Sequence, residues 1–375
     1  MLFRRPRLAA LVLFSLLLGG CKVGRFVIYN FADTDDYKKF PSRALPVSPT
    51  PWDYPAVAVE QAPRTITTDG KEEAFDTFLE EHKTVAFLVI RRDTVVYERY
   101  FKGYHPGQMH ASFSMAKSVI SMLIGCAVDD GYIRNVRQPV TDFIPELKGN
   151  GFDKVTVEHL LQMTGGLKFN ESYSNPFGDA ASFYYGRRMY HYMGKMKLAH
   201  EPGTHFEYQS GSSQLLGWVL ERAMQQHNDI RTVTRYLNDK LWAPLGMVYP
   251  ASWSVDRKKG GIEKTFCCLN APARDFAKLG SLYLHGGNWQ GRQLVSKAWV
   301  DQSTRVDTTG ASAWYYQYQW WLPSQEGDFM ARGILGQYIY VDPARELVMV
   351  RLGTKVGGIN WGAVFRDLAR SWPSP

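Results

Sequence analysis

The chain has 375 residues, long enough for one large catalytic domain or two smaller ones. Hydrophobic residues make up 45% of it, which supports a sizeable core and excludes a largely disordered chain. The formal net charge of +8 is spread along the sequence, with no basic stripe carrying interleaved aromatic residues, so we expect no nucleic-acid partner.

The first 21 residues have the features of an export signal. Arg4, Arg5 and Arg7 precede an apolar run over residues 8–18, which is too short to span a bilayer comfortably. Two glycines and Cys21 follow, a pattern that resembles the bacterial lipoprotein signal, in which the cysteine is lipidated. We therefore expect a lipoprotein of the bacterial cell envelope, lipid-anchored at Cys21 and facing the periplasm, on the outer membrane of a Gram-negative host. An ordinary signal peptide is the alternative.

Residues 22–70 contain many prolines and no helical periodicity, which predicts a tether between the anchor and a folded domain at 71–375, partly draped over that domain. Apolar periodicity and turn signals in that domain predict helices and two strand hairpins. The helices are expected at Lys71–His82, Ser114–Asp130, Glu158–Met163, Ser212–Gln226, Ile230–Trp242, Ala273–His285 and about Trp361–Trp372. The hairpins are expected to pair Val85–Ile90 with Thr94–Tyr100 and Gly336–Val341 with Glu346–Leu352.

Strands near both ends, with helices between them, predict an α/β (α+β) fold. One antiparallel sheet would be assembled from distant parts of the chain and flanked by helices. A mostly helical subdomain would be inserted at about residues 135–272.

Ser114 and Lys117 open the apolar helix that begins at Ser114. Side chains three residues apart share a helix face, so the hydroxyl and the amine project together. A serine hydroxyl needs a base to become a nucleophile, and a partly buried lysine with a lowered pKa can be that base. The position of the pair at the start of a buried helix carries more weight than the pattern, which is expected about once by chance in a chain of this length.

A second polar group should pass the proton to the leaving group. Three Tyr-x-Ser/Asn patterns occur, and the one at Tyr236 lies inside an amphipathic helix, so we interpret it as structural. Tyr208, with Ser210, lies in a loop just before a helix, where its phenol can point into a cleft. Tyr173 is also in a loop and is expected at the edge of the substrate pocket or on the surface.

The third expected element is a strand edge that offers backbone N–H groups to an oxyanion. Gly336 and Gln337 begin an alternating strand, and a glycine there allows a substrate to approach closely. The alternative is that the glycine only shapes the entry to the strand.

The order Ser114-x-x-Lys117, Tyr208-x-Ser210 and a glycine on a late strand resembles the class C beta-lactamase-like serine hydrolases. His159–Leu167 is similar to that family's "LLTMTSGL" segment, and Ala273–Ala277 is similar to its later helix. The stretch Gly333–Gln337 looks closest to the branch that contains esterases and 6-aminohexanoate-dimer hydrolases. The likeness covers roughly residues 72–372.

The resemblance implies a beta-lactamase and penicillin-binding-protein-like fold and cleavage of an ester or amide through an acyl group on Ser114, without a metal or organic cofactor. Lys117 would be the base, and Tyr208, with a pKa lowered by the neighbouring ammonium, would transfer protons. The N–H groups of Ser114 and Gln337 would hold the oxyanion. The small-molecule substrate itself is not identified by the sequence.

Two departures from the family pattern bear on the substrate. Tyr208 is followed by Ser210 where class C beta-lactamases have an asparagine, and no Lys-Thr-Gly or Lys-Ser-Gly occurs. The alternatives are a D-amino-acid peptidase or carboxypeptidase or a beta-lactamase acting on cell-wall-like substrates, and a non-catalytic lipoprotein that binds cell-wall fragments. Cys126 is expected to be a buried apolar residue, and whether Cys126, Cys267 or Cys268 forms a disulfide is left open.

Overall fold

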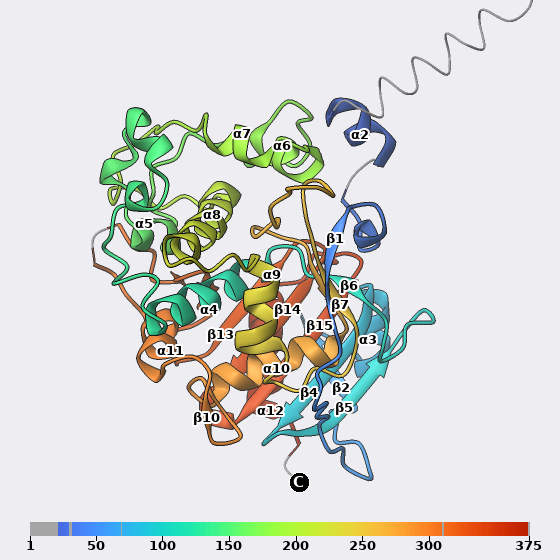
Figure 1. Cartoon of the computed structure of the whole chain (residues 1–375). Helices are drawn as coiled ribbons and strands as arrows, with labels where there is room; N and C mark the ends of the chain where they lie inside the picture. Colours follow the sequence, from blue (N-terminus) through green and yellow to red (C-terminus); the bar gives the residue numbers. More distant parts are fainter. Residues whose placement is uncertain (1–21, 30–31, 69, 310, 374–375) are drawn as a thin grey trace, which may run out of the picture.

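The computed structural model describes residues 22–29, 32–68, 70–309 and 311–373. Its centre is a seven-stranded antiparallel sheet with the strand order β11-β12-β13-β14-β15-β4-β5. The strands are β4 (Thr84–Arg91), β5 (Thr94–Tyr100), β11 (Tyr316–Gln317), β12 (Trp320–Trp321), β13 (Phe329–Gly333), β14 (Gln337–Asp342) and β15 (Leu347–Gly353). Distant parts of the chain thus form one sheet, which confirms the predicted assembly (Figure 1).

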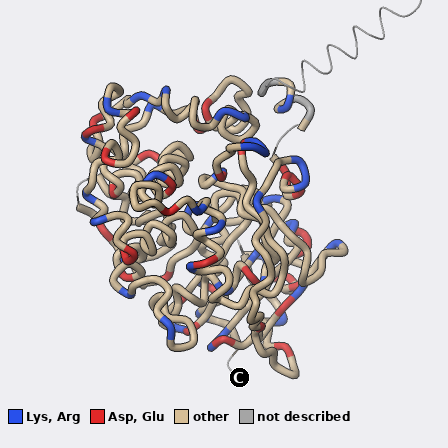
Figure 2. The backbone as a smooth tube through the Cα atoms, viewed as in Figure 1, with Lys and Arg blue, Asp and Glu red and all other residues tan. Residues whose placement is uncertain are grey.

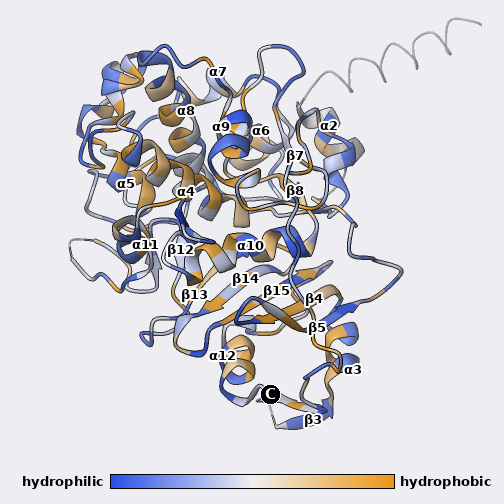
Figure 3. Cartoon of the chain, turned by 60° about the horizontal axis from the view of Figure 1, so that its bottom comes forward, coloured by the Kyte–Doolittle hydropathy of each residue, from blue (hydrophilic) through white to orange (hydrophobic). Residues whose placement is uncertain are grey.

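Helices cover both faces of this sheet (Figure 3). Strand β4 is apolar along its length because alternate side chains enter two cores: Leu88 packs in the core on one side and Phe87 in the core on the other. The first core includes α4 (Met115–Asp129) and α10 (Ala273–Leu284), and the second includes α3 (Phe75–Glu81) and α12 (Trp361–Ser371).

The predicted helices are present, with differences at their ends. The helix expected from Lys71 begins only at Phe75, because Lys71–Ala74 forms strand β3, which pairs with β2 (Thr65–Thr68). The helix expected from Ile230 begins at Val233, where the Thr232 hydroxyl caps it. The remaining helices are α2 (Lys22–Tyr29), α5 (Val157–Leu161), α6 (Asp179–Tyr185), α7 (Met189–Met193), α8 (Ser210–Gln226), α9 (Val233–Leu237) and α11 (Lys297–Thr304).

A second, four-stranded sheet was not predicted, because its strands are short and far apart in the sequence. Its order is β1-β7-β8-β6, and its strands are β1 (Ser42–Leu45), β6 (His110–Ala111), β7 (Ala251–Ser254) and β8 (Leu269–Ala271). A two-stranded ribbon of β9 (Asn288–Trp289) and β10 (Arg292–Gln293) completes the strands.

The segment expected to be a tether, residues 22–70, packs largely against the body. Strand β1 pairs with β7, and the Val57 N–H donates to Val95 O at 3.1 Å. A domain boundary at residue 70 would divide the β2–β3 hairpin. The prolines therefore belong to an extended segment that is hydrogen-bonded to the body, and not to a free linker.

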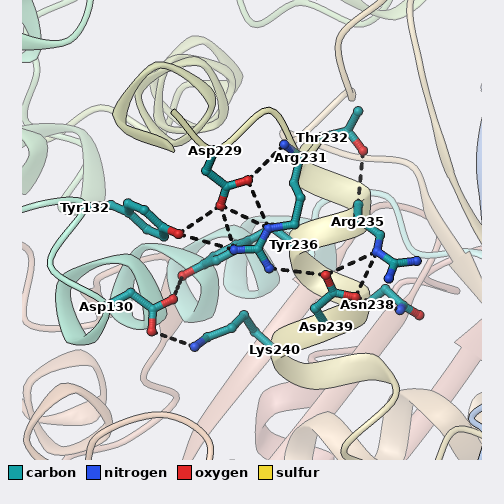
Figure 4. A network of polar contacts seen from close by, with 10 residues as sticks. All are labelled: Asp130, Tyr132, Asp229, Arg231, Thr232, Arg235, Tyr236, Asn238, Asp239 and Lys240. Carbon is teal, nitrogen blue, oxygen red and sulfur yellow. Dashed lines mark hydrogen bonds and ion pairs between the residues drawn. The ribbon is translucent and has the colours of Figure 1, made fainter. Parts of the chain in front are cut away.

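The C-terminal end of α4 is held by a network of polar side chains (Figure 4). Asp130 accepts hydrogen bonds from the Tyr236 hydroxyl at 2.8 Å and from Lys240 Nζ at 2.6 Å. Arg231 joins Asp229 and Asp239 at 2.6 and 3.2 Å. These contacts fix α4 against α9 and the π-helical turn Asn238–Trp242, so Tyr236 has a structural role, as interpreted from the sequence.

The positions of basic and acidic residues are interspersed along the described backbone, in agreement with the spread of charge along the sequence (Figure 2). Within residues 22–29, 32–68, 70–309 and 311–373, no helix has the length and apolar character needed to cross a membrane.

The packing of α10 on the sheet depends on Gly280. A Cβ atom there would lie 2.7 Å from Val348 Cγ1 and 2.8 Å from Ile339 Cγ2, inside normal contact. We expect Gly280→Ala to lower the free energy of unfolding by about 1–3 kcal/mol, as overpacked cores do. Urea denaturation would measure it. Gly149→Ala, which meets nothing within 4 Å, is the matched control, and equal losses in both variants would contradict the packing argument.

Candidate active site

The Ser114 side chain is presented by a sharp turn at the start of α4. Phe113 has a φ of 46°, in the left-handed region, and Ser114 follows as the residue before the first helical one. Strand β13 approaches this turn so closely that a Cβ atom on Gly333 would lie 2.3 Å from Ser112 O. A glycine is therefore required at position 333, where the end of β13 meets the turn that carries Ser114.

Lys117 lies one helical turn further along, with 1% of its surface exposed. Its Nζ donates to Ser114 Oγ at 3.1 Å, to Ser210 Oγ at 3.1 Å and to Phe266 O at 2.8 Å. Burial lowers the pKa of Lys117 to about 8, although the negative charge of Glu171 acts in the opposite direction. A large fraction of this amine is thus neutral at mildly alkaline pH.

Glu171 fixes the orientation of Ser210. The Ser210 hydroxyl donates to Glu171 Oε1 at 2.6 Å, and the Ser210 N–H donates to Oε2 at 2.7 Å. With its proton committed to the carboxylate, Ser210 Oγ can only accept from Lys117. The Phe266 carbonyl is also an acceptor only. The neutral amine has two N–H groups, and once Ser210 and Phe266 take both, its lone pair faces Ser114.

Tyr208 lies beside the candidate base, with its ring centroid 5.1 Å from Lys117 Nζ. Its ring packs against those of Tyr316 and Trp321, with centroids 5.8 and 5.4 Å away. Burial raises the pKa of Tyr208, while a hydrogen bond with Ser114 and the charge of Arg332 act to lower it. A lowered pKa of Tyr208 was predicted from the sequence, and this direction is wrong because desolvation of the phenol outweighs the neighbouring charges. Tyr208 is therefore a protonated hydroxyl at neutral pH.

The Tyr173 hydroxyl donates to Glu171 Oε1 at 2.6 Å, and its side chain lines a pocket beside Ser114. With 42% of its surface exposed, Tyr173 forms the rim of that pocket and not its floor.

The pocket beside Ser114 has a volume of about 180 Å³ and a mainly apolar lining. The residues that line it are Ala32, Phe113, Ser114, Tyr173, Ala180, Ala181, Tyr184, Tyr185, Ser210, Phe266, Cys267, Ile334 and Leu335. A larger open depression of about 880 Å³ lies near the opposite end of α4, around Asp129 and Gln302, and does not include Ser114. Of these two, the smaller pocket contains the candidate nucleophile and has the mainly apolar lining.

Gly336 and Gln337 do not line this pocket. The Gln337 side chain turns into the sheet, where its Nε2 donates to Gly353 O at 2.7 Å, and Gly336 packs against the Arg351 side chain. The residues of this hairpin that line the pocket with Ser114 are Ile334 and Leu335, directly after Gly333. Among the described residues, neither the Ser114 N–H nor the Ile334 N–H has a backbone acceptor. The structure therefore does not bring Gln337 to the pocket that holds Ser114, because β13 and the residues directly after it lie there, which the sequence did not reveal.

Three residues at the site were missed in the sequence. Glu171 lies two positions before Tyr173 without a motif of its own, Phe266 contributes only its carbonyl, and Ile334 contributes its position at the end of β13. The next two residues after Phe266, Cys267 and Cys268, form a disulfide with each other, which the sequence had left open. Cys126 is buried, as expected, and is a free cysteine.

Comparisons with known proteins identify the family. The Beta-lactamase family model matches residues 72–363. The chain is 30% identical over 326 residues to a 6-aminohexanoate-dimer hydrolase of Paenarthrobacter ureafaciens, covering 80% of each chain. A provisionally assigned 6-aminohexanoate-dimer hydrolase of Bacillus anthracis superimposes with a TM-score of 0.80, at 24% identity, over 91% of this chain and 94% of that one.

A family VIII carboxylesterase superimposes with a TM-score of 0.61, at 16% identity, over 79% of this chain and 94% of that one. The shared fold confirms the antiparallel sheet flanked by helices that the resemblance implied. The chain belongs to the Beta-lactamase family and is a serine hydrolase of that family, similar to 6-aminohexanoate-dimer hydrolases and carboxylesterases.

Proposed function

We propose that this protein cleaves esters or amides of small uncharged acyl groups through an acyl-enzyme on Ser114. The observation that carries the proposal is the arrangement around Lys117. Two acceptors, Ser210 Oγ and Phe266 O, engage its N–H groups and leave the lone pair of the neutral amine facing Ser114 Oγ at 3.1 Å. A general base needs this geometry and a pKa near the working pH.

In the first step, Ser114 Oγ attacks the substrate carbonyl while its proton passes to Lys117. Tyr208 donates its hydroxyl proton to the leaving atom, and the Lys117 ammonium restores that proton, so Lys117 is neutral again. Water then attacks the acyl-enzyme, Lys117 accepts its proton, and Ser114 regains one as the acid leaves. The raised pKa of Tyr208 supports a donor role, since a phenolate could not protonate the leaving group.

The negative charge on the carbonyl oxygen would be held by the N–H groups of Ser114 and Ile334, in place of Gln337. Support comes from the position of Ile334 on the wall of the pocket and from the lack of backbone acceptors for both N–H groups in the described part of the chain. One such donor contributes about 2.7–4 kcal/mol to transition-state stabilisation in comparable enzymes.

The two sides of Ser114 would receive different parts of the substrate. Tyr208 must reach the leaving atom, so the leaving group extends toward Tyr208 and Trp321, and the acyl group enters the apolar pocket on the Ser210 side. No Asp, Glu, Lys or Arg lines that pocket among the described residues, which favours an uncharged acyl group. Tyr173 at the rim would contact the substrate.

We also propose that the protein acts in the bacterial cell envelope, facing the periplasm and lipid-anchored at Cys21. This rests on the N-terminal sequence pattern alone, and Cys21 lies outside the described residues.

The nucleophile is tested by Ser114→Ala, which we expect to abolish turnover and labelling by a fluorophosphonate probe, measured by intact-protein mass. Ser121→Ala is the matched control in the same helix, because its buried hydroxyl has no hydrogen-bond partner in the described structure. Turnover retained by Ser114→Ala would rule out the mechanism. A folded wild type that neither reacts with the probe nor turns over would favour the cell-wall-binding lipoprotein.

The pH dependence tests Lys117. Because only the neutral amine accepts the Ser114 proton, kcat/KM should rise with pH through an apparent pKa of about 8 and level off above it. The Glu171 charge raises the Lys117 pKa, so Glu171→Gln should move the rising limb to lower pH. Glu81→Gln, at an exposed position, is the control. If the rising limb of the pH profile stays at the same pH or moves to higher pH in Glu171→Gln, Lys117 is not the base whose pKa the profile reports.

The pocket sets a limit on the acyl group. A pocket of about 180 Å³ holds a short acyl chain but not a long one. In a series of p-nitrophenyl esters, kcat/KM should fall from short to long acyl chains and for acyl chains that end in a carboxylate. Ala181→Leu, in the pocket wall, should shift the preference to acetyl, while Ala298→Leu, at an exposed position elsewhere, should not. No change in preference would show that the acyl group binds elsewhere.

A further inference from the structure

Three consecutive residues connect the candidate base to a disulfide. Phe266 O accepts a hydrogen bond from Lys117 Nζ at 2.8 Å. The next residue, Cys267, is bonded to Cys268 and lines the pocket that holds Ser114. A disulfide between neighbouring residues closes a small ring around their peptide bond, so neither cysteine can rotate independently of the other.

The far side of this segment is fixed by β7. Trp253 Nε1 donates to Cys267 O at 3.0 Å, and the Ser254 N–H donates to Cys268 O at 2.9 Å. Cys268 has a φ of 72°, a backbone conformation that non-glycine residues seldom adopt. Because this conformation is unfavourable for an isolated cysteine, surrounding constraints must maintain it. The disulfide is the covalent one among them.

The Phe266 carbonyl has a defined task at the site. It is one of the two acceptors that leave the Lys117 lone pair directed at Ser114, and it reaches Lys117 from the residue directly before the disulfide. If Cys267 and Cys268 were free to rotate, this carbonyl would lose its fixed position, while Ser210, held by Glu171 on another element, would keep its own.

We propose that the Cys267–Cys268 disulfide positions Lys117 through the Phe266 carbonyl, so that the oxidised protein is the active form and reduction slows acyl transfer. This proposal rests on the proposed function of Ser114 and Lys117. Cys267 and Cys268 are positioning residues, since the substrate's reacting atoms contact Ser114 and not the sulfur atoms. In the reduction, a small dithiol gives up two electrons and two protons; the S–S bond breaks, each sulfur becomes a thiol, and the dithiol becomes a disulfide.

The test measures ester hydrolysis by the full protein before reduction, after reduction and after reoxidation. Thiols are counted by alkylation and intact-protein mass, and circular dichroism monitors folding. We expect reduction of this pair to lower kcat/KM about tenfold or more, as small misplacements of a catalytic group do, and reoxidation to restore it. Cys267→Ser/Cys268→Ser should have the low activity of the reduced protein and no response to the dithiol. Cys126→Ala, which removes the free cysteine, should respond like the wild type.

The pH profile separates positioning from stability. The titratable groups facing Lys117 are Glu171 and Tyr208, and both remain in the double variant. Loss of the Phe266 acceptor removes a hydrogen bond that favours the ammonium, so the rising limb of kcat/KM should move to lower pH. A loss of activity that follows only the folded fraction, with the limb in place, would overturn the proposal. So would full activity in the double variant or in wild type with both thiols alkylated.

The proposed function of Ser114 and the proposed role of the disulfide can be tested separately. If Ser114 reacts with the fluorophosphonate probe and Ser114→Ala is inactive, the proposed function holds whatever the dithiol does. If the probe does not react with either the oxidised or the reduced protein, the proposed function fails first.

Discussion

The site depends on a lysine amine that is almost completely removed from water. Lys117 is 1% exposed, and its charged form is disfavoured there because no carboxylate contacts it directly among the described residues. The nearest acidic group, Glu171, acts through the Ser210 hydroxyl. This separation leaves the amine able to lose its proton near pH 8, whereas direct contact with a carboxylate would hold it charged.

The rest of the fold can be understood from the need to bring four parts of the chain to this amine. Helix α4 supplies Ser114 and Lys117, the start of α8 supplies Ser210, and the end of β13 supplies Ile334. Phe266 comes from the connection between β7 and β8. These segments are far apart in the sequence. Their relative positions are set by packing in the core on one face of the seven-stranded sheet and by the four-stranded sheet, whose strand β6 leads into the turn that carries Ser114.

The sequence was sufficient for the parts of the site that have a local signature. Ser114 and Lys117 share a helix face, and Tyr208 with Ser210 precedes a clear helix, so spacing and position identified them. The sequence was insufficient where geometry depends on tertiary contacts. The end of β13 carries no pattern that distinguishes Ile334 from Gln337, and Glu171 becomes relevant only because a loop folds over Ser210.

The helices and strands were likewise predicted where a local pattern marks them and missed where they depend on contacts between distant parts of the chain. Long apolar segments such as α4, β4 and β15 lie within about a residue of the predicted ends, because both periodicity and burial favour them. The four-stranded sheet was missed because β1, β6, β7 and β8 have two to four residues each and pair only across long distances in the chain. The direction of the Tyr208 pKa was also beyond the sequence, since it depends on how deeply the phenol is buried.

One wall of the pocket beside Ser114 comes from a segment that precedes the part of the chain matched by the family model. Ala32 lines the pocket, and the Tyr184 hydroxyl beside it donates to Asp36 Oδ2 at 2.6 Å, yet the family match begins only at residue 72. The shape of this pocket therefore depends on the N-terminal segment as well as on residues within the family-model match, and a protein shortened to residues 72–363 would lose part of the pocket wall.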